Sequence, residues 1–488
     1  MNVNPITRLD YPDPDVIRVE DTYYMISTTM HFMPGCEILQ SFDLVHWEHA
    51  TYVYETLDHT DAQQLKSGQN IYGQGMWAAS LRYHEGRFYI CFVANDTRKT
   101  YLYTSEKIDG PWKKQLIEGF YHDGSLLFDE DGRNYIVYGN DEIWITELNE
   151  DLTAPKKDGL HRLLVSDHKN PELGYEGSHI QKINGYYYIF LIHSLRDRWM
   201  RTEACFYSDS LEGEFTGGDV LCDDRGYCGQ GVAQGGIVDT PDGKWYAMLF
   251  QDSGAVGRIP ILVPVTWKDH FPFFGQNGHV PEEIEVHSTR PGYIYQPLVG
   301  SDDFCNGLLP RWQFNHDPDP RYYHLDALQG TYTITTREVC TELTQAVNTL
   351  TQRMSYPSCA AEVTVDASAL KEGDVAGLCA LQGCYAAVGV TKHHGKYEVL
   401  MLDKKEDGIL DMTERTVVES HQMDFRLEAD FCNMKDEARC YYRVNKGDWL
   451  PIGTVHKLYF KLDHFTGCRF GLFCYAAEET GGSACFRD

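Results

Sequence analysis

One short pattern recurs five times in the first half of the chain: a turn residue, usually glycine, followed closely by strand-forming and mostly aromatic residues. The copies occupy residues 21–24, 86–89, 132–135, 185–188 and 243–246. Gly, Asn and Asp tolerate the positive φ of a tight turn, and aromatic residues favour the strand that follows, so each copy predicts a β-hairpin. Five successive hairpins predict a five-bladed β-propeller, in which four-stranded sheets surround a central channel.

The repeats share a second position, which lies upstream of the last tyrosine of each copy. Counting back by the same interval, one residue shorter in the first repeat, gives Asp13, Trp77, Asp123, Glu176 and Gln234. Equivalent positions in the blades are expected to form a ring at one mouth of the channel. Three of them are carboxylates, and grouping mutually repelling acids costs stability unless function requires it. Solvated acids that reached the blade edges by chance are the alternative, because charged residues normally lie on the surface.

Length and composition limit the classes of protein that remain. A chain of 488 residues is too long for one compact core, so at least two domains are expected. The formal charge of −29 argues against nucleic acid or an anionic membrane as a partner. No apolar run approaches the ~20 residues of a membrane span, and the N-terminus has no basic stretch followed by an apolar run.

The cysteines predict a reducing environment. The chain has 15 of them, and none forms a CxxC pair or a Cys/His set with zinc-site spacing. They are therefore interpreted as reduced thiols that fill the cores as small hydrophobic groups. A cytoplasmic location is the expectation that follows.

A change of pattern divides the chain. The blade pattern continues through the apolar strand at 259–265, and polar, proline-bearing sequence follows at 275–300. Beyond it, stretches such as 330–335, 360–365, 397–402 and 439–444 alternate with the period of half-buried strands. We therefore expect an all-β chain with a five-bladed propeller at 1–285, a linker at 286–300 and a β-sandwich at 301–488.

The three acids have the number and type that glycosidic bond cleavage requires. One protonated carboxyl group gives its proton to the departing oxygen, and a second, ionised group acts on water or on the anomeric carbon. A third acid nearby tunes and orients the proton donor. Asp13, Asp123 and Glu176 can fill these roles. A sugar-binding protein that does not hydrolyse its ligand is the alternative from another class, although binding alone has no need of a repelling trio.

Four segments resemble the glycoside hydrolases of family 43, namely residues 11–16, 75–78, 122–126 and 176–180. The resemblance implies a five-bladed propeller enzyme that inverts configuration, with Asp13 as general base and Glu176 as general acid. It also implies that Asp123 orients and tunes Glu176. Asp15, close to Asp13, is interpreted as structural. Residues 348–353 are similar to the sandwich of the xylosidase branch, so the likeness covers nearly the whole chain.

The resemblance further implies six substrate-binding residues, which are His31, Phe32, Trp77, Gln234, Arg258 and Phe465. Phe465 would reach the propeller mouth from the sandwich and close the pocket. Plainer interpretations remain open: His31 as a satisfied loop histidine, the other aromatic residues as core, and Arg258 as an ion-pair partner of an acid.

Metal content and substrate are less constrained. Many family members have a histidine where Gln234 stands, and in several it helps to hold calcium in the channel. A glutamine carbonyl oxygen suits a hard cation, so structural Ca²⁺ is possible, although the chemistry requires no cofactor. The expected function is an inverting exo-glycosidase that removes terminal xylose or arabinofuranose from xylo- or arabinoxylo-oligosaccharides, foremost as a β-xylosidase. A dedicated α-L-arabinofuranosidase is the alternative within the class, and an oligomer is possible.

Overall fold

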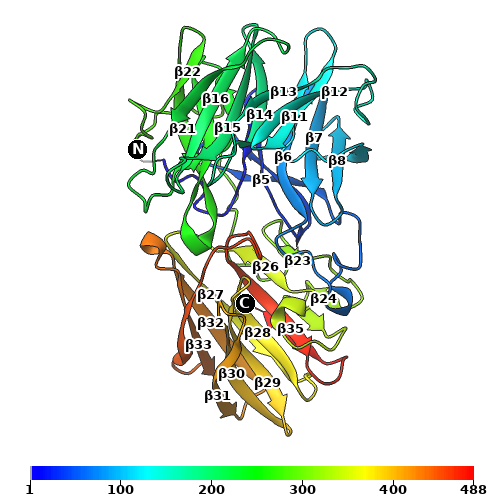
Figure 1. The fold of residues 1–488 in the computed structure, drawn as a ribbon. Coiled ribbons are helices and arrows are strands. Elements are labelled where there is room, and N and C mark those ends of the chain that lie inside the picture. The colour runs from blue at the N-terminus through cyan, green and yellow to red at the C-terminus, as the bar shows by residue number, and fades with distance from the viewer. Residues whose placement is uncertain (1–2, 488) are drawn as a thin grey trace.

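The computed structural model describes residues 3–487, which form two all-β bodies in contact with each other (Figure 1). The upper body, blue to green, holds five small sheets, and the lower body, yellow to red, holds two large ones. The predicted five-bladed propeller followed by a β-sandwich is confirmed. Within residues 3–487, no helix is long and apolar enough to cross a membrane.

Each blade is an antiparallel sheet built in chain order. The first has β1 (Asp15–Val19), β2 (Thr22–Ile26), β4 (Gly35–Ser41) and β5 (Glu48–Tyr54). The second has β6 (Met76–His84), β7 (Arg87–Ala94), β8 (Lys99–Ser105) and β9 (Lys113–Ile117). The third has β10 (Ser125–Phe128), β11 (Asn134–Asn140), β12 (Glu142–Leu148) and β13 (His161–Ser166).

The fourth blade has β14 (Glu176–Ile183), β15 (Tyr186–Ser194), β16 (Arg201–Ser208) and β17 (Thr216–Leu221). The fifth has β18 (Val232–Ala233), β19 (Ile237–Asp239), β20 (Trp245–Asp252), β21 (Arg258–Lys268) and β22 (Phe271–Phe274). The glycines of the recurring pattern lie in the hairpin turns and have φ between 78° and 85°, namely Gly86, Gly132, Gly185 and Gly243. The pattern therefore marks the turn that its residues predict.

A buried ion pair joins neighbouring blades around the channel. Arg82 donates from Nη1 to Asp15 Oδ2 at 2.7 Å, and His179 Nδ1 lies 3.1 Å from Oδ1. Arg82 Nη2 also donates to Ser125 Oγ at 2.7 Å, so one guanidinium connects the first, second and third blades. Burial alone would raise the pKa of Asp15, but Arg82 and His179 hold it below the ordinary value. This network supports the structural interpretation of Asp15.

The N-terminal segment closes the ring against the last blade. Asn4 exchanges two hydrogen bonds with the backbone of Leu262, both 2.8 Å long. The backbone N–H of Tyr11 donates to the carbonyl of Arg258 at 3.0 Å. The first and fifth blades are thereby joined, and Asp13 is brought beside Arg258.

The sandwich consists of two antiparallel sheets. One contains, in spatial order, β3 (Phe32–Met33), β23 (Gln313–Asn315), β26 (Leu350–Arg353), β35 (Arg469–Ala476), β28 (Asp374–Leu381), β29 (Ala386–His393), β30 (Lys396–Lys404) and β31 (Leu410–Val418). The other contains β24 (Tyr323–Asp326), β25 (Thr331–Thr335), β36 (Ser483–Arg487), β27 (Ser358–Asp366), β32 (Gln422–Asp430), β33 (Glu437–Val444) and β34 (Leu450–Lys457).

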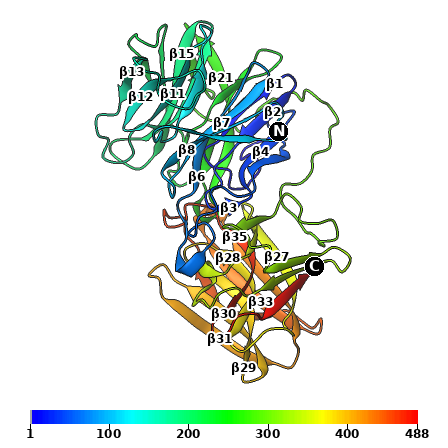
Figure 2. The same cartoon turned by 90° about the vertical axis from the view of Figure 1, so that its right-hand side faces the viewer.

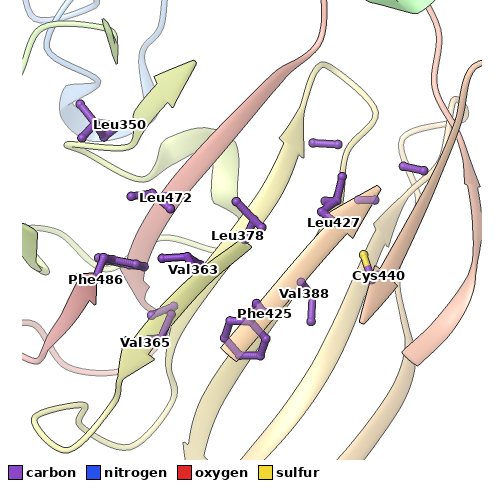
Figure 3. Packing of buried hydrophobic residues seen from close by; sticks show 14 of the residues in the cluster. Leu350, Val363, Val365, Leu378, Val388, Phe425, Leu427, Cys440, Leu472 and Phe486 are labelled. Carbon is purple, nitrogen blue, oxygen red and sulfur yellow. The ribbon is translucent and has the colours of Figure 1, made fainter. Parts of the chain in front are cut away.

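Alternate residues of the two sandwich sheets meet in a continuous core. Leu378 and Val388 of one sheet and Phe425 of the other are fully or almost fully buried, and Figure 3 shows them between the strands with Leu427 and Leu472. The period-two alternation of the sequence therefore arises, as predicted, from strands that bury one face. Four single-turn 3-10 helices complete the described chain, η1 (Lys66–Gly68), η2 (Gly254–Val256), η3 (Leu343–Gln345) and η4 (Cys432–Met434).

The segment between the bodies lies against the propeller. No strand falls between β22 and β23, and Figure 2 shows a long connection that descends from propeller to sandwich. Thr289 N–H donates to the carbonyl of Phe42 at 2.7 Å, and Gln296 N–H donates to Glu48 Oε2 at 2.8 Å. The predicted linker at 286–300 is thus anchored on the first blade. Its limits, and those of the two domains, remain predictions.

A buried arginine of the sandwich joins the two bodies. Arg353 lies 2.8 Å from Glu37 Oε2 and donates from Nε to the carbonyl of Asp10 at 2.9 Å. Its guanidinium carbon also lies 4.1 Å from the ring centre of Tyr11. Burial alone would raise the pKa of Glu37, but Arg353 and His49 lower it to about 2. The interface therefore depends on a fully desolvated charge pair.

Candidate active site

A cavity of about 900 Å³ lies where the propeller meets the sandwich. All five ring positions predicted from the repeat line it, namely Asp13, Trp77, Asp123, Glu176 and Gln234. Arg258 of the fifth blade and Phe465 of the sandwich line it as well. The structure therefore brings together seven of the nine residues predicted for the site.

Unusual backbone conformations place the ring residues at the cavity. Asp13, Asp123 and Gln234 have φ values of 52°, 47° and 57°, in the left-handed region that side chains seldom adopt. The other two positions lie at irregularities, because the pairing of β6 with β7 shifts between Met76 and Ala79, and that of β14 with β15 after Glu176. Bulges of this kind re-aim side chains, and both features concentrate at functional sites.

The carboxyl group of Asp13 accepts hydrogen bonds from two donors. Thr28 Oγ1 donates to Oδ2 at 2.6 Å, and Arg258 Nη1 donates to Oδ1 at 2.8 Å. The carboxyl group is almost fully buried. Nε and Nη2 of Arg258 are buried and have no hydrogen-bond partner among the described residues. Arg258 is thus both an ion-pair partner and a lining residue.

Asp123 is fully buried beside the other acids. The backbone N–H of Gly177 donates to Oδ2 at 3.1 Å. Burial, together with the nearby Glu176 and Asp13, raises the pKa of Asp123 to about 6, although His122 opposes this rise. The site therefore contains mutually coupled acids, as the repeat predicted.

Glu176 has two neighbours for which sequence analysis predicted no role. Asn140 Nδ2 donates to Oε2 at 2.6 Å, and His122 Nε2 lies 3.4 Å from the same oxygen. His122 Nε2 is also 3.7 Å from Asp123 Oδ2, and Asp123, with Glu176 and Asp13, raises the pKa of His122 to about 9. His122 could have been suspected from its place before Asp123, but Asn140 only ends β11 and carries no comparable signal.

The sandwich contributes one wall of the cavity. Phe465 lies on the loop between β34 and β35, and its ring centre is 5.5 Å from that of Trp77. The guanidinium carbon of Arg258 is 4.4 Å from the same ring centre. Phe460 and Leu462 of this loop also line the cavity. Two aromatic rings and a cation therefore meet beside the acids.

His31 and Phe32 do not line the cavity, and the prediction that they contact sugar is wrong. His31 is fully buried, with its ring centre 4.7 Å from that of Tyr72 and 4.9 Å from that of His316. Phe32 packs under the guanidinium of Arg469, 3.4 Å from the ring centre. The local sequence could not reveal this, because β3 pairs with β23, which is far away in the chain.

The described residues do not fit a calcium ion. Within residues 3–487 one group brings three potential ligands within 4.8 Å of one another, and it is His122, Asp123 and Glu176. Because Asp123 raises the pKa of His122 to about 9, this imidazole would have to lose a proton before it could bind a cation near neutral pH. Calcium also requires a larger set of oxygen ligands. The proposed channel calcium near Gln234 therefore gains no support.

A propeller whose cavity gathers three acids, an arginine and aromatic rings defines a glycoside hydrolase. The chain belongs to glycosyl hydrolases family 43, whose model matches residues 3–272. A second model, the beta xylosidase C-terminal concanavalin A-like domain, matches residues 301–488.

Several known proteins are similar to most or nearly all of this chain. A beta-xylosidase of Formosa agariphila is 27% identical, with 98% of this chain and 88% of that protein covered. Xylosidase/arabinosidase 43B of Humicola insolens is 27% identical over 77% of this chain and 74% of its own. The solved structure of a bifunctional GH43-CE protein of Bacteroides eggerthii is 42% identical with a TM-score of 0.92. It covers 99% of this chain, which spans 62% of that protein.

Proposed function

We propose that the chain is an inverting exo-glycosidase that removes terminal xylose, or arabinofuranose, from xylo- or arabinoxylo-oligosaccharides. The observation that carries this proposal is the meeting of Asp13, Asp123 and Glu176 in one cavity beside Trp77 and Phe465. Aromatic faces suit the apolar face of a sugar ring, and the acids suit its cleavage.

In the proposed reaction Asp13 takes a proton from a water whose oxygen bonds to the anomeric carbon. The bond from that carbon to the leaving oxygen breaks at the same time, and Glu176 gives this oxygen its proton. The carboxyl group of Asp13 accepts hydrogen bonds from Thr28 and from the guanidinium of Arg258, and such an environment suits a base. Inversion needs room for the water, so the carboxyl groups of Asp13 and Glu176 are expected to be ~6.5 to 9.5 Å apart.

Attack at chain ends follows from the wall that the sandwich adds. Phe460, Leu462 and Phe465 of the loop between β34 and β35 line the cavity, and we expect the loop to block the path of a continuous polysaccharide. A blind pocket of this kind accepts a terminal sugar or a side branch. Xylose is favoured because the second family model is that of a beta-xylosidase domain, although the names of the relatives are compatible with either sugar.

The deciding experiment uses 4-nitrophenyl β-D-xyloside and 4-nitrophenyl α-L-arabinofuranoside with the wild type, Asp13→Asn and Glu176→Ala. We expect one glycoside to be hydrolysed strongly and the reaction to fall by about 10²–10⁴-fold in each variant, since each loses an acid–base group. NMR of the first-formed sugar should show the inverted anomer. Silence of the folded wild type on both glycosides would contradict the proposal and favour the non-hydrolytic binding protein.

We also propose that the enzyme works in a reducing compartment such as the cytoplasm. Its 15 cysteines are all unpaired, and eight of them are buried as small core groups. Detection of the native protein in a cytoplasmic rather than an external fraction would test this.

A further inference from the structure

The two oxygens of the Glu176 carboxyl group have different surroundings. Asn140 Nδ2 lies 2.6 Å from Oε2, and His122 Nε2 lies 3.4 Å from the same atom. No hydrogen bond to Oε1 is present among the described residues. The side chain is 22% exposed and lines the cavity. One oxygen is therefore held by the protein and the other remains available to the sugar.

The chemistry of the two neighbours decides which oxygen can carry a proton. An amide nitrogen only donates, so Oε2 must accept from Asn140. Asp123 raises the pKa of His122 to about 9, so near neutral pH its Nε2 is also a donor. Because Oε2 already accepts from two N–H groups, a hydrogen on this oxygen could not form a hydrogen bond with either of them. The protonated acid must therefore have its hydrogen on Oε1.

We propose that Glu176 transfers its proton from Oε1, and that Asn140 and His122 are positioning residues that hold the carboxyl group in this orientation. This inference depends on the proposed role of Glu176 as general acid. As the bond to the leaving oxygen breaks, the hydrogen passes from Oε1 to that oxygen and its bonding pair stays on the carboxylate. Asn140 and His122 then stabilise the new negative charge through Oε2.

The test is the dependence of hydrolysis on the leaving group. A series of aryl glycosides of the sugar that the wild type accepts is hydrolysed by the wild type, Asn140→Ala and His122→Phe. A 2,4-dinitrophenyl group leaves without much help, whereas a 4-methoxyphenyl group needs the proton. We expect kcat/KM of each variant to fall by about 10²-fold on the methoxyphenyl glycoside but by less than about threefold on the dinitrophenyl glycoside.

Two comparisons separate positioning from general damage. His122→Gln keeps an N–H donor and should recover most of the loss on the methoxyphenyl glycoside. His161→Phe removes a histidine of the same blade, on β13, that does not line the cavity, and should leave both rates unchanged. Circular dichroism and thermal unfolding establish that each variant is folded, and the separate substitutions of Asn140 and His122 give two independent tests.

An equal loss on all leaving groups, or no loss at all, would overturn the inference while the hydrolytic function stands. A wild type that releases no aryl group, the dinitrophenyl group included, would instead refute the proposed function. A wild type that hydrolyses well with Glu176→Ala unaffected would refute the assignment of the acid, and with it this inference.

Discussion

At the scale of single residues, the buried acids that suit the cavity for catalysis lower the stability of the fold. Asp123 is buried next to Glu176 and Asp13, and a buried carboxylate among like charges is less stable than its neutral form. A folded-state pKa of about 6, above the ordinary 3.8, means that this group favours folding while it is protonated. Its contribution is fully present below pH 3.8 and is lost as the pH rises through about 6.

We therefore expect Asp123→Asn to stabilise the fold while it lowers turnover. At pH 8 the free energy of unfolding of the variant should exceed that of the wild type by about 3 kcal/mol. This value follows from about 1.4 kcal/mol for each pH unit between the ordinary pKa of 3.8 and the folded-state pKa of about 6. The difference should vanish below about pH 4. Urea unfolding at several pH values measures it.

Glu130→Gln is the matched control, since this acid is 84% exposed and lies on a turn of the same blade. It should change the free energy of unfolding by less than about 0.5 kcal/mol at any pH. A wild type that is as stable as Asp123→Asn at pH 8 would show that the burial of this acid carries no cost.

At the scale of elements, the loop at residues 458–468 brings the sandwich into the site. Gly467 N–H donates to Asp10 Oδ2 at 2.8 Å, and Cys468 N–H donates to the carbonyl of Ala255 at 2.8 Å. The close approach also restricts Gly73, since a Cβ there would lie 2.3 Å from the carbonyl oxygen of Leu462. The loop is hydrogen-bonded to the propeller after Phe465 and lies close against Gly73 before it, so the aromatic wall is held at the cavity.

We expect Phe465→Ala to raise KM about tenfold and to weaken inhibition by free xylose by a similar factor. The ring supplies an aromatic face to the sugar, a contact of roughly 1.4 kcal/mol, while the backbone anchors of the loop remain. Steady-state kinetics with xylose as inhibitor measures both. Val455→Ala, a 49% exposed residue of the neighbouring β34, should change neither value. Unchanged kinetics in Phe465→Ala would exclude a contact between this ring and the sugar.

At the scale of the whole molecule, contacts between the two bodies predict that they unfold together. β3 leaves the first blade to pair with β23, and Arg353 of the sandwich neutralises Glu37 of the propeller. Both side chains of this pair are at least 95% buried. Separation would expose a desolvated charge pair and open one side of the cavity.

Arg353→Ala should lower the free energy of unfolding by about 3–5 kcal/mol, because it leaves Glu37 buried without its cation. Calorimetry should show that both bodies still unfold in one transition. Lys371→Ala removes an ion pair with Glu479 at the surface, where the side chains are 38% and 75% exposed, and should cost at most about 1 kcal/mol. Equal losses in the two variants would show that the interface pair does not couple the bodies.

The repeat by itself determined the propeller, its number of blades and the identity of the ring residues. A hairpin turn such as Gly185 and a ring position such as Glu176 have the same spacing in the last four repeats and are one residue closer in the first, so local sequence carries that information. The alternation of the second half likewise determined a sandwich, because one face of each strand must be buried.

Tertiary structure alone decided which side chains meet across elements. It placed His31 and Phe32 under the sandwich instead of at the cavity, and it set Asn140 and His122 on Glu176 from a neighbouring blade. It also paired Arg353 with Glu37. These contacts join residues far apart in the chain, and their energies depend on burial and on distances of a few ångströms, which no local pattern encodes.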